Sequence, residues 1–97
     1  MMIIEPPYKV NDIVSMKLVT GEEVIGKLLE DTNDSIRLGK PFMLMMSQQG
    51  PALAPFLLSV DPNTSEAKMD KMHIIALFKT QQETARSYIE HTTGIVT

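Results

Sequence analysis

The stretch Ile13-Val-Ser-Met-Lys-Leu-Val-Thr-Gly-Glu-Glu-Val-Ile-Gly-Lys-Leu28 decides the fold, because its two glycines, five residues apart, mark a strand–turn–strand pattern. On the first arm, Val14, Met16 and Leu18 alternate with polar residues, which is the two-residue period of a half-buried strand. Gly21 supplies the turn, since glycine reaches positive φ without steric cost. The sequence therefore predicts a β-hairpin.

Gly26 lies inside the second arm of this hairpin. Val24 and Leu28 share its face, and Ile25 and Lys27 lie on the other. A glycine inside a strand usually marks a bulge, a sharp bend or a close backbone approach. A hairpin bent at such a glycine is how a small sheet begins to curl into a barrel. The same pattern also fits an ordinary hairpin in any small β protein, so both interpretations stay open at this point.

Composition limits the classes of protein that fit. The 97 residues carry nine Lys and Arg against twelve Asp and Glu, for a net charge of −3, and no cysteine. Without cysteine there is no disulfide framework, thiol nucleophile or thiolate zinc site. A chain that grips nucleic acid over a wide face is normally basic, so a nucleic-acid role requires a small local site here. With no apolar run of membrane-spanning length and no recognisable secretory leader, we expect a soluble cytoplasmic protein that contacts no membrane.

Further strands follow the hairpin. The turn Asp31–Ser35 is polar, and Gly39-Lys40-Pro41 is expected to break the chain between two strands. The strand Phe42–Met46 is apolar without alternation, which predicts that Met43, Met45 and Met46 pack in the core. The segment Ala52–Pro55 is too interrupted by proline to assign. The expected extended segments are Ile36–Leu38, Phe42–Met46, Phe56–Val60, Ala67–Met69 and, after a tight corner at Asp70-Lys71, Met72–Phe78.

One helix is well marked near the C-terminus. Thr80 and Glu83 have the spacing of a capping box, in which each side chain bonds a backbone amide of the other residue. Tyr88 and Ile89 fall on one narrow apolar face, and Gly94 is placed to end the helix in a left-handed conformation. A helix this short is not stable alone, so we expect it to lie across the open end of the barrel.

The fold class predicted from these elements is mainly β: a small, strongly bent antiparallel barrel of five strands, Sm-like or SH3-like, with a C-terminal helix. The chain forms a single domain. Its expected parts are an N-terminal extension over residues 1–11, the barrel over 12–78 and the helix over 80–93.

These residues carry a resemblance. The pattern Val14-x-Met16-x-Leu18-x-x-Gly21-x-x-x-x-Gly26-x-Leu28, with the acidic turn and Ile36-x-Leu38 after it, resembles the first motif of the Sm and Sm-like (LSm) family. It covers roughly residues 10 to 40. Met69-Asp70-Lys71 before the last strand echoes the family's second motif. The chain also looks like short Sm-like proteins that bacteriophages encode. The resemblance implies a highly curved sheet whose subunits close into rings that bind single-stranded RNA.

Two features depart from the family pattern. Sm proteins usually carry a helix before the first strand, whereas the marked helix here is C-terminal. The family's base pocket includes a stacking side chain, and the turn Asp31-Thr32-Asn33-Asp34-Ser35 has no aromatic residue. Base stacking is therefore missing from this loop. The resemblance still places a nucleic-acid site at this turn and at the following corner, and its expected residues are Asp31, Asn33, Ser35, Lys71 and Met72.

The last strand also predicts how subunits meet. Met72–Phe78 has no proline, glycine or inward charge to protect it as a sheet edge, and such an edge promotes association. We expect it to pair with the edge near Ala67–Met69 of another copy, in a ring of five to seven subunits by resemblance to Sm assemblies. The expected interface residues are Ala67, Lys68, Met69, Met72, Ile74, Ala76 and Phe78.

Catalytic patterns are weak. His73 lies in an apolar strand and His91 near a helix end, and no spacing places either beside a nucleophile. Carboxylates in the turn at Asp31 more often cap their own backbone than hold a cation. We therefore expect no enzyme, catalytic residue, metal or cofactor. The predicted function is a ring-forming Sm-like protein that binds single-stranded RNA or DNA. The alternative is a structural or protein-interaction module without a nucleic-acid ligand.

Overall fold

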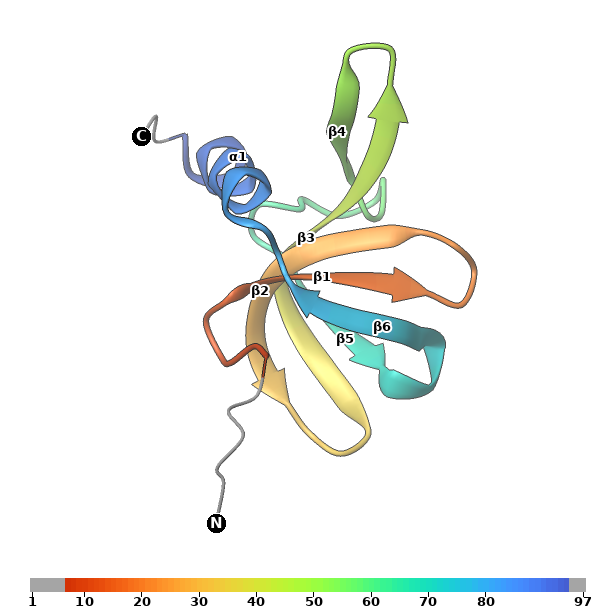
Figure 1. Cartoon of the computed structure of the whole chain (residues 1–97). Coiled ribbons are helices and arrows are strands. Elements are labelled where there is room, and N and C mark those ends of the chain that lie inside the picture. The colour runs from red at the N-terminus through yellow and green to blue at the C-terminus, as the bar shows by residue number, and fades with distance from the viewer. Residues whose placement is uncertain (1–6, 95–97) are drawn as a thin grey trace.

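Six strands of one antiparallel sheet and a C-terminal helix form the part of the chain that the computed structural model describes, residues 7–94 (Figure 1). In chain order the elements are β1 (Ile13–Leu18), β2 (Glu23–Asp31), β3 (Ser35–Ser47), β4 (Gly50–Pro55), β5 (Glu66–Asp70), the 3-10 helix η1 (Lys71–His73), β6 (Ile74–Lys79) and α1 (Gln82–Thr93). The predicted mainly β antiparallel class with a C-terminal helix is confirmed. Residues 1–6 of the expected N-terminal extension lie outside the described residues.

The β1–β2 hairpin is the centre of the sheet. Val14 pairs with Gly26 and Met16 with Val24, and Gly21 turns the chain at φ +104°. Hydrogen-bonded neighbours then follow the order β4-β3-β2-β1-β6, and β5 pairs with the first half of β3. The predicted hairpin is confirmed in both arms and in its turn.

A bulge in β3 lies opposite Gly26 of the second strand. In the β2–β3 ladder, Ile25 pairs with Phe42 and Lys27 with Gly39, so Gly26 alone faces the two residues Lys40 and Pro41. A bulge of this kind bends the strand that carries the extra residue, here β3, and increases the local twist. The strands also approach closely here, because a Cβ at Gly26 would lie 2.9 Å from the carbonyl oxygen of Gly39. The close approach expected of this glycine is confirmed.

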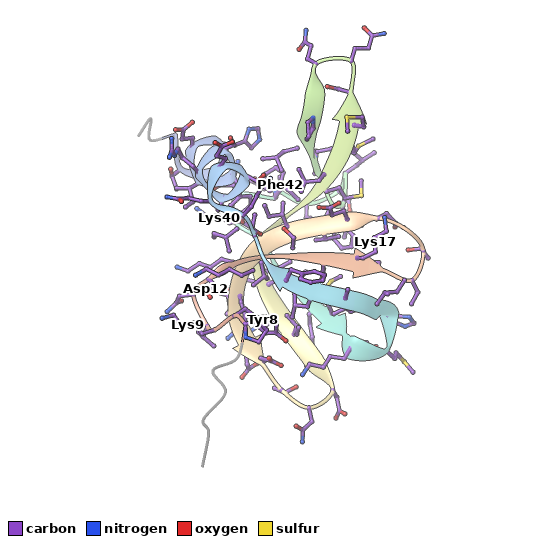
Figure 2. The ribbon with its side chains drawn as sticks, viewed as in Figure 1. Tyr8, Lys9, Asp12, Lys17, Lys40 and Phe42 are labelled. Atoms are coloured by element: carbon purple, nitrogen blue, oxygen red, sulfur yellow. The ribbon has the colours of Figure 1, made fainter. Side chains whose placement is uncertain are left out.

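Two apolar clusters lie on opposite faces of the curved sheet. Neighbouring residues of a strand face opposite ways, so Val24 joins one cluster and Ile25 the other. The larger cluster lies inside the bend and consists of Val14, Met16, Leu18, Val24, Leu28, Ile36 and Leu38. The smaller cluster joins Ile25 and Phe42 to Tyr88 of the helix. Figure 2 shows Phe42 between α1 and the β3–β4 hairpin.

Tyr88 fixes α1 on the outer face of the sheet. Its ring packs edge-on to Phe42, with centroids 6.1 Å apart. Its hydroxyl donates to the carbonyl oxygens of Lys40 at 2.6 Å and Gly39 at 3.1 Å. Burial raises the pKa of this phenol, because the charged form loses its hydration. Gly94 ends the helix at φ +74°, as the sequence predicts.

The start of α1 differs from the prediction. The helix begins at Gln82 with Gln81 as its N-cap, and no side chain caps it. The predicted capping box at Thr80 is therefore wrong. The Thr80 hydroxyl is instead buried 2.6 Å from the Ser15 hydroxyl, and a bond to β1 replaces the bond to the helix amide.

The second half of the sheet also differs from the prediction. The expected break at Gly39-Lys40-Pro41 is wrong, because β3 continues through it with Lys40 at φ +50°. β4 forms over Gly50–Pro55, where its prolines lie on an edge strand, and it makes the count six strands in place of the expected five. The strand expected over Phe56–Val60 is not formed.

The hairpin of β3 and β4 stands away from the bent sheet beside α1 (Figure 1). Met43 packs against the larger cluster, but Met45 is exposed and Met46 has 80% of its surface exposed. The prediction that all three methionines pack in the core is therefore wrong for Met45 and Met46, because the hairpin extends past the core. No helix in the described part of the chain is long and apolar enough to cross a membrane.

Candidate nucleic-acid interface

The turn between β2 and β3 is closed by its own polar groups. The Thr32 amide donates to the Ser35 carbonyl oxygen at 2.9 Å, and the Ser35 amide donates to the Thr32 hydroxyl at 3.1 Å. The two hydroxyls lie 3.1 Å apart. Asn33 and Asp34 are exposed between them. The Ser35 hydroxyl is therefore hydrogen-bonded within the turn, whereas the side-chain amide of Asn33 faces solvent.

The corner before β6 lies directly against this turn. Ser35 pairs with Asp70 in the β3–β5 ladder. Because η1 follows Asp70 directly, this register places η1 beside the turn. The Lys71 amide donates to the Asp34 carbonyl oxygen at 2.9 Å, and the Lys71 ammonium lies 2.6 Å from a carboxylate oxygen of Asp31. Thus the structure brings together the two segments that the sequence analysis placed in one site.

Carboxylates outnumber cations around the site. Arg37 lies 2.7 Å from Glu66 and 3.7 Å from Glu30, and its hydrogen bond with Glu66 raises the pKa of the guanidinium. The charged residues of the turn, the corner and β5 are Glu30, Asp31, Asp34, Glu66 and Asp70 against Arg37, Lys68 and Lys71. Lys71 is partly neutralised by Asp31, so a phosphate at this corner competes with an existing ion pair. Met72 is 78% exposed beside it.

The outer edges of β5 and β6 form no ladder with any described strand. β5 pairs with β3, and β6 pairs with β1. Of the predicted interface residues on β5, Lys68 is exposed, and Ala67 and Met69 are half-buried. Both edges keep backbone donors and acceptors that can pair with another strand.

A bulge changes the faces of β6. Lys17 pairs with Ala76 and Leu18 with Ile74, so Ile75 is the extra residue and is exposed. Ile74 packs against the larger cluster, whereas Phe78 is 65% exposed. The sequence analysis did not include Ile75 among the exposed interface residues, because a strict two-residue period, with Ile74, Ala76 and Phe78 on one face, places Ile75 on the buried face. No pattern in the sequence marks this bulge.

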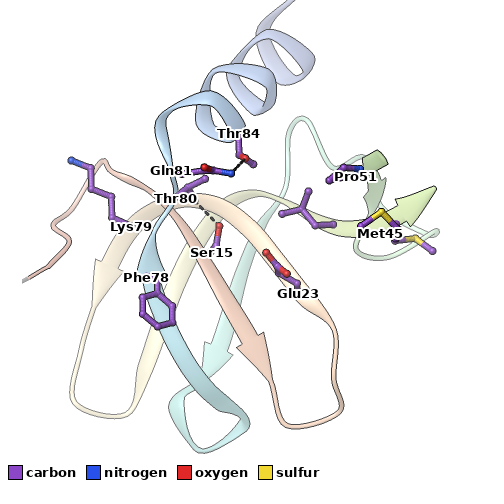
Figure 3. A pocket seen from close by; sticks show the side chains of 11 residues that line it. Ser15, Glu23, Met45, Pro51, Phe78, Lys79, Thr80, Gln81 and Thr84 are labelled. Atoms are coloured by element: carbon purple, nitrogen blue, oxygen red, sulfur yellow. Dashed lines mark hydrogen bonds between the residues drawn. The ribbon is translucent and has the colours of Figure 1, made fainter. Parts of the chain in front are cut away.

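A groove of about 480 Å³ separates β6 from the β3–β4 hairpin (Figure 3). Phe78 and Met45 line opposite sides of it, and Glu23 lies between them. Met45 and Met46 belong to the groove, a role the sequence analysis missed because it assigned them to the core.

Among residues 7–94, no three His, Asp or Glu side chains gather as the ligands of a metal ion. The turn and corner can offer a base an exposed amide at Asn33 and an apolar side chain at Met72, with one cation held by Asp31. No model of a known protein family matches this chain, and no curated protein matches its sequence.

Proposed function

We propose that the chain is a ring-forming Sm-like protein that binds single-stranded RNA or DNA. The observation that carries the proposal is the pair of open strand edges beside the joined turn and corner. The six strands are then an open, strongly bent barrel, and the β6 edge of one copy pairs with the β5 edge of the next. Because this contact is head-to-tail, it closes into a ring when the rotation per subunit allows.

Assembly explains how a weak site becomes useful. One Asn33 amide and one partly neutralised Lys71 give little affinity, and the turn offers no aromatic ring for stacking. A ring repeats the site at a fixed spacing, so one strand can engage several copies and gain avidity without new contacts. Asn33 contacts base edges and Lys71 contacts phosphate, which are the usual roles of an amide and an ammonium.

Fluorescence anisotropy with U-rich, A-rich and mixed single strands, at low and moderate salt, tests this proposal. We expect binding at micromolar protein that weakens with salt. Asp31→Asn should bind more tightly, because it removes a negative charge and frees the Lys71 ammonium. Asp70→Asn is the matched control, since it removes the same charge beside the site from a residue in no described ion pair. No binding of any strand would refute the proposal.

A second candidate function, a protein-interaction module, rests on exposed apolar side chains. Leu58 is 96% exposed and Met46 is 80% exposed, and both are far from the turn in sequence. Exposed methionine suits adaptable protein contacts. A protein that copurifies from a gentle lysate, with an absorbance spectrum free of nucleic acid, would favour this module. The change Met46→Gln should then reduce the copurified protein without affecting oligonucleotide binding.

A further inference from the structure

Four of the nine lysine and arginine residues line two grooves on the flank of α1. Two grooves, of about 500 and 530 Å³, lie along this flank and share Asn11, Ile13 and Ile89, so they are adjacent. The cations that line them are Lys27 and Lys40 in one groove and Lys79 and Arg86 in the other. We call these four residues and the three shared ones the helix-flank surface.

The cations of this surface are available for a ligand. None of the four is in an ion pair with a described residue. The two grooves hold the carboxylates of Asp12 and Glu66, and both are already engaged. Glu66 binds Arg37 at 2.7 Å, and Asp12 accepts the Lys9 amide at 3.0 Å. The four cations outnumber these two carboxylates, so the helix-flank surface is net positive, in contrast to the acidic surroundings of Lys71.

The fold holds these cations on separate rigid elements. Lys27 pairs with Ile13 and Lys79 with Val14, so both lie on strands next to β1. Lys40 is positioned by the bulge opposite Gly26, because its amide donates to the Ser65 carbonyl at 2.9 Å and its own carbonyl accepts the Tyr88 hydroxyl. Arg86 comes from α1. Four elements thus place cations along one surface, with Ile13 and Ile89 as an apolar divider between the grooves.

We propose that the backbone of single-stranded nucleic acid lies along the helix-flank surface and that its phosphates contact these four cations. The inference rests on the proposed function and places the main electrostatic contact away from Lys71. Lysines meet phosphate as point charges, and Arg86 can bind phosphate oxygens with two parallel hydrogen bonds. Tyr88 is buried, so its ring is not available for stacking there. Binding at this surface is therefore tolerant of sequence and sensitive to salt.

The size of the effect follows from counterion release. For single strands, each phosphate contact adds about 0.7 to the slope of log affinity against log salt, so one contact is worth about fivefold in affinity at 0.1 M salt. Lys79→Ala should then weaken binding about fivefold. The double change Lys79→Ala with Arg86→Ala should weaken it about 25-fold and reduce the slope by about 1.4.

The control is Lys17→Ala, which removes one exposed lysine from the side of the sheet opposite Lys40 and Lys9 (Figure 2). Anisotropy with a mixed-sequence single strand, titrated over a range of salt concentrations, should show little change for this variant. Circular dichroism spectra that match the wild type will show that each variant is folded.

Three results would overturn the inference. If the wild type binds and the double variant shows the same slope of log affinity against log salt, the inference is refuted and the proposed function stands. No binding by the wild type would refute both. Binding of a polyglutamate peptide, with no binding of oligonucleotides, would assign the surface to an acidic protein.

Discussion

Adding a single methyl group at Gly26 should destabilise the protein, because the main sheet has no space there. A Cβ at this position would overlap the Leu38 side chain and lie 2.9 Å from the Gly39 carbonyl oxygen. Leu38 belongs to the larger cluster and is fully buried, so it cannot move into solvent. The Gly39 oxygen accepts the Tyr88 hydroxyl, so moving this backbone also loosens α1.

The magnitude follows from these contacts. Forcing extra carbon into a packed core costs about 1–3 kcal/mol, and a backbone contact is harder to relieve than one with a flexible side chain. We therefore expect Gly26→Ala to lower the free energy of unfolding by about 2 kcal/mol, and Gly26→Val by about 3 kcal/mol or more. With a urea slope near 1.5 kcal/mol/M for a chain of this size, the alanine variant should unfold about 1.3 M earlier.

Urea denaturation followed by circular dichroism, at one protein concentration, measures the difference. Gly50→Ala is the control, because Gly50 has φ +105° and nothing within 4 Å of an added Cβ. Gly50→Ala should lower the free energy of unfolding by about 1 kcal/mol, through backbone strain alone. A Gly26→Ala midpoint within about 0.3 M of the wild type would show that the strands separate easily and would refute the reasoning.

Three further changes have expected outcomes. Tyr88→Phe removes the donor to the Gly39 and Lys40 carbonyl oxygens and should cost about 1–3 kcal/mol in thermal or urea denaturation. The pKa of Tyr88 is raised above 10.0, the ordinary value for a tyrosine. Well below pH 10.0 the phenol is protonated in both the folded and the unfolded chain, so its contribution to stability is constant there. Above that pH stability falls, because the unfolded chain releases the proton first. The Phe variant should lack this part of the decline, which begins near pH 10.0 and continues as the pH rises. Ser15→Ala leaves the buried Thr80 hydroxyl without its partner and should cost about 1 kcal/mol, whereas Lys17→Ala on the same strand should change the midpoint little.

Local patterns predicted the parts of the fold that local physics decides. The alternation through Val14 and Met16, and the glycine turn, define the β1–β2 hairpin without reference to the rest of the chain. The close approach at Gly26 was also predictable, since a glycine inside a strand usually marks a place where the backbone bends or another strand comes near. The helix was predicted from its apolar face and its C-terminal glycine.

Tertiary contacts decided the parts that the sequence analysis missed. The Thr80 hydroxyl has two possible partners, and its bond to Ser15 depends on where β6 meets β1. The strand continues through Lys40 because the bulge opposite Gly26 absorbs the irregularity there. The exposure of Met46 depends on how far the β3–β4 hairpin extends beyond the core, and no local pattern determines that length.

The same limit applies to the candidate site. The family resemblance placed Asp31 and Lys71 in one expected site, and their atoms lie 2.6 Å apart in the structure. The contact itself, which holds the lysine on a carboxylate, could not be predicted from order along the chain. The helix-flank surface joins Lys27, Lys40, Lys79 and Arg86 from four elements, so it becomes visible only when the chain is folded.

Light scattering coupled to size-exclusion chromatography tests the central claim, assembly through the open edges of β5 and β6, most directly. At tens of micromolar protein we predict a single species of five to seven times the 10.8 kDa chain mass. Lys68→Glu, on the exposed face of β5, should shift the protein toward smaller species, whereas Lys9→Glu, the same charge change at an exposed residue outside the strands, should not. A clean monomer of the wild-type chain at that concentration would contradict the ring.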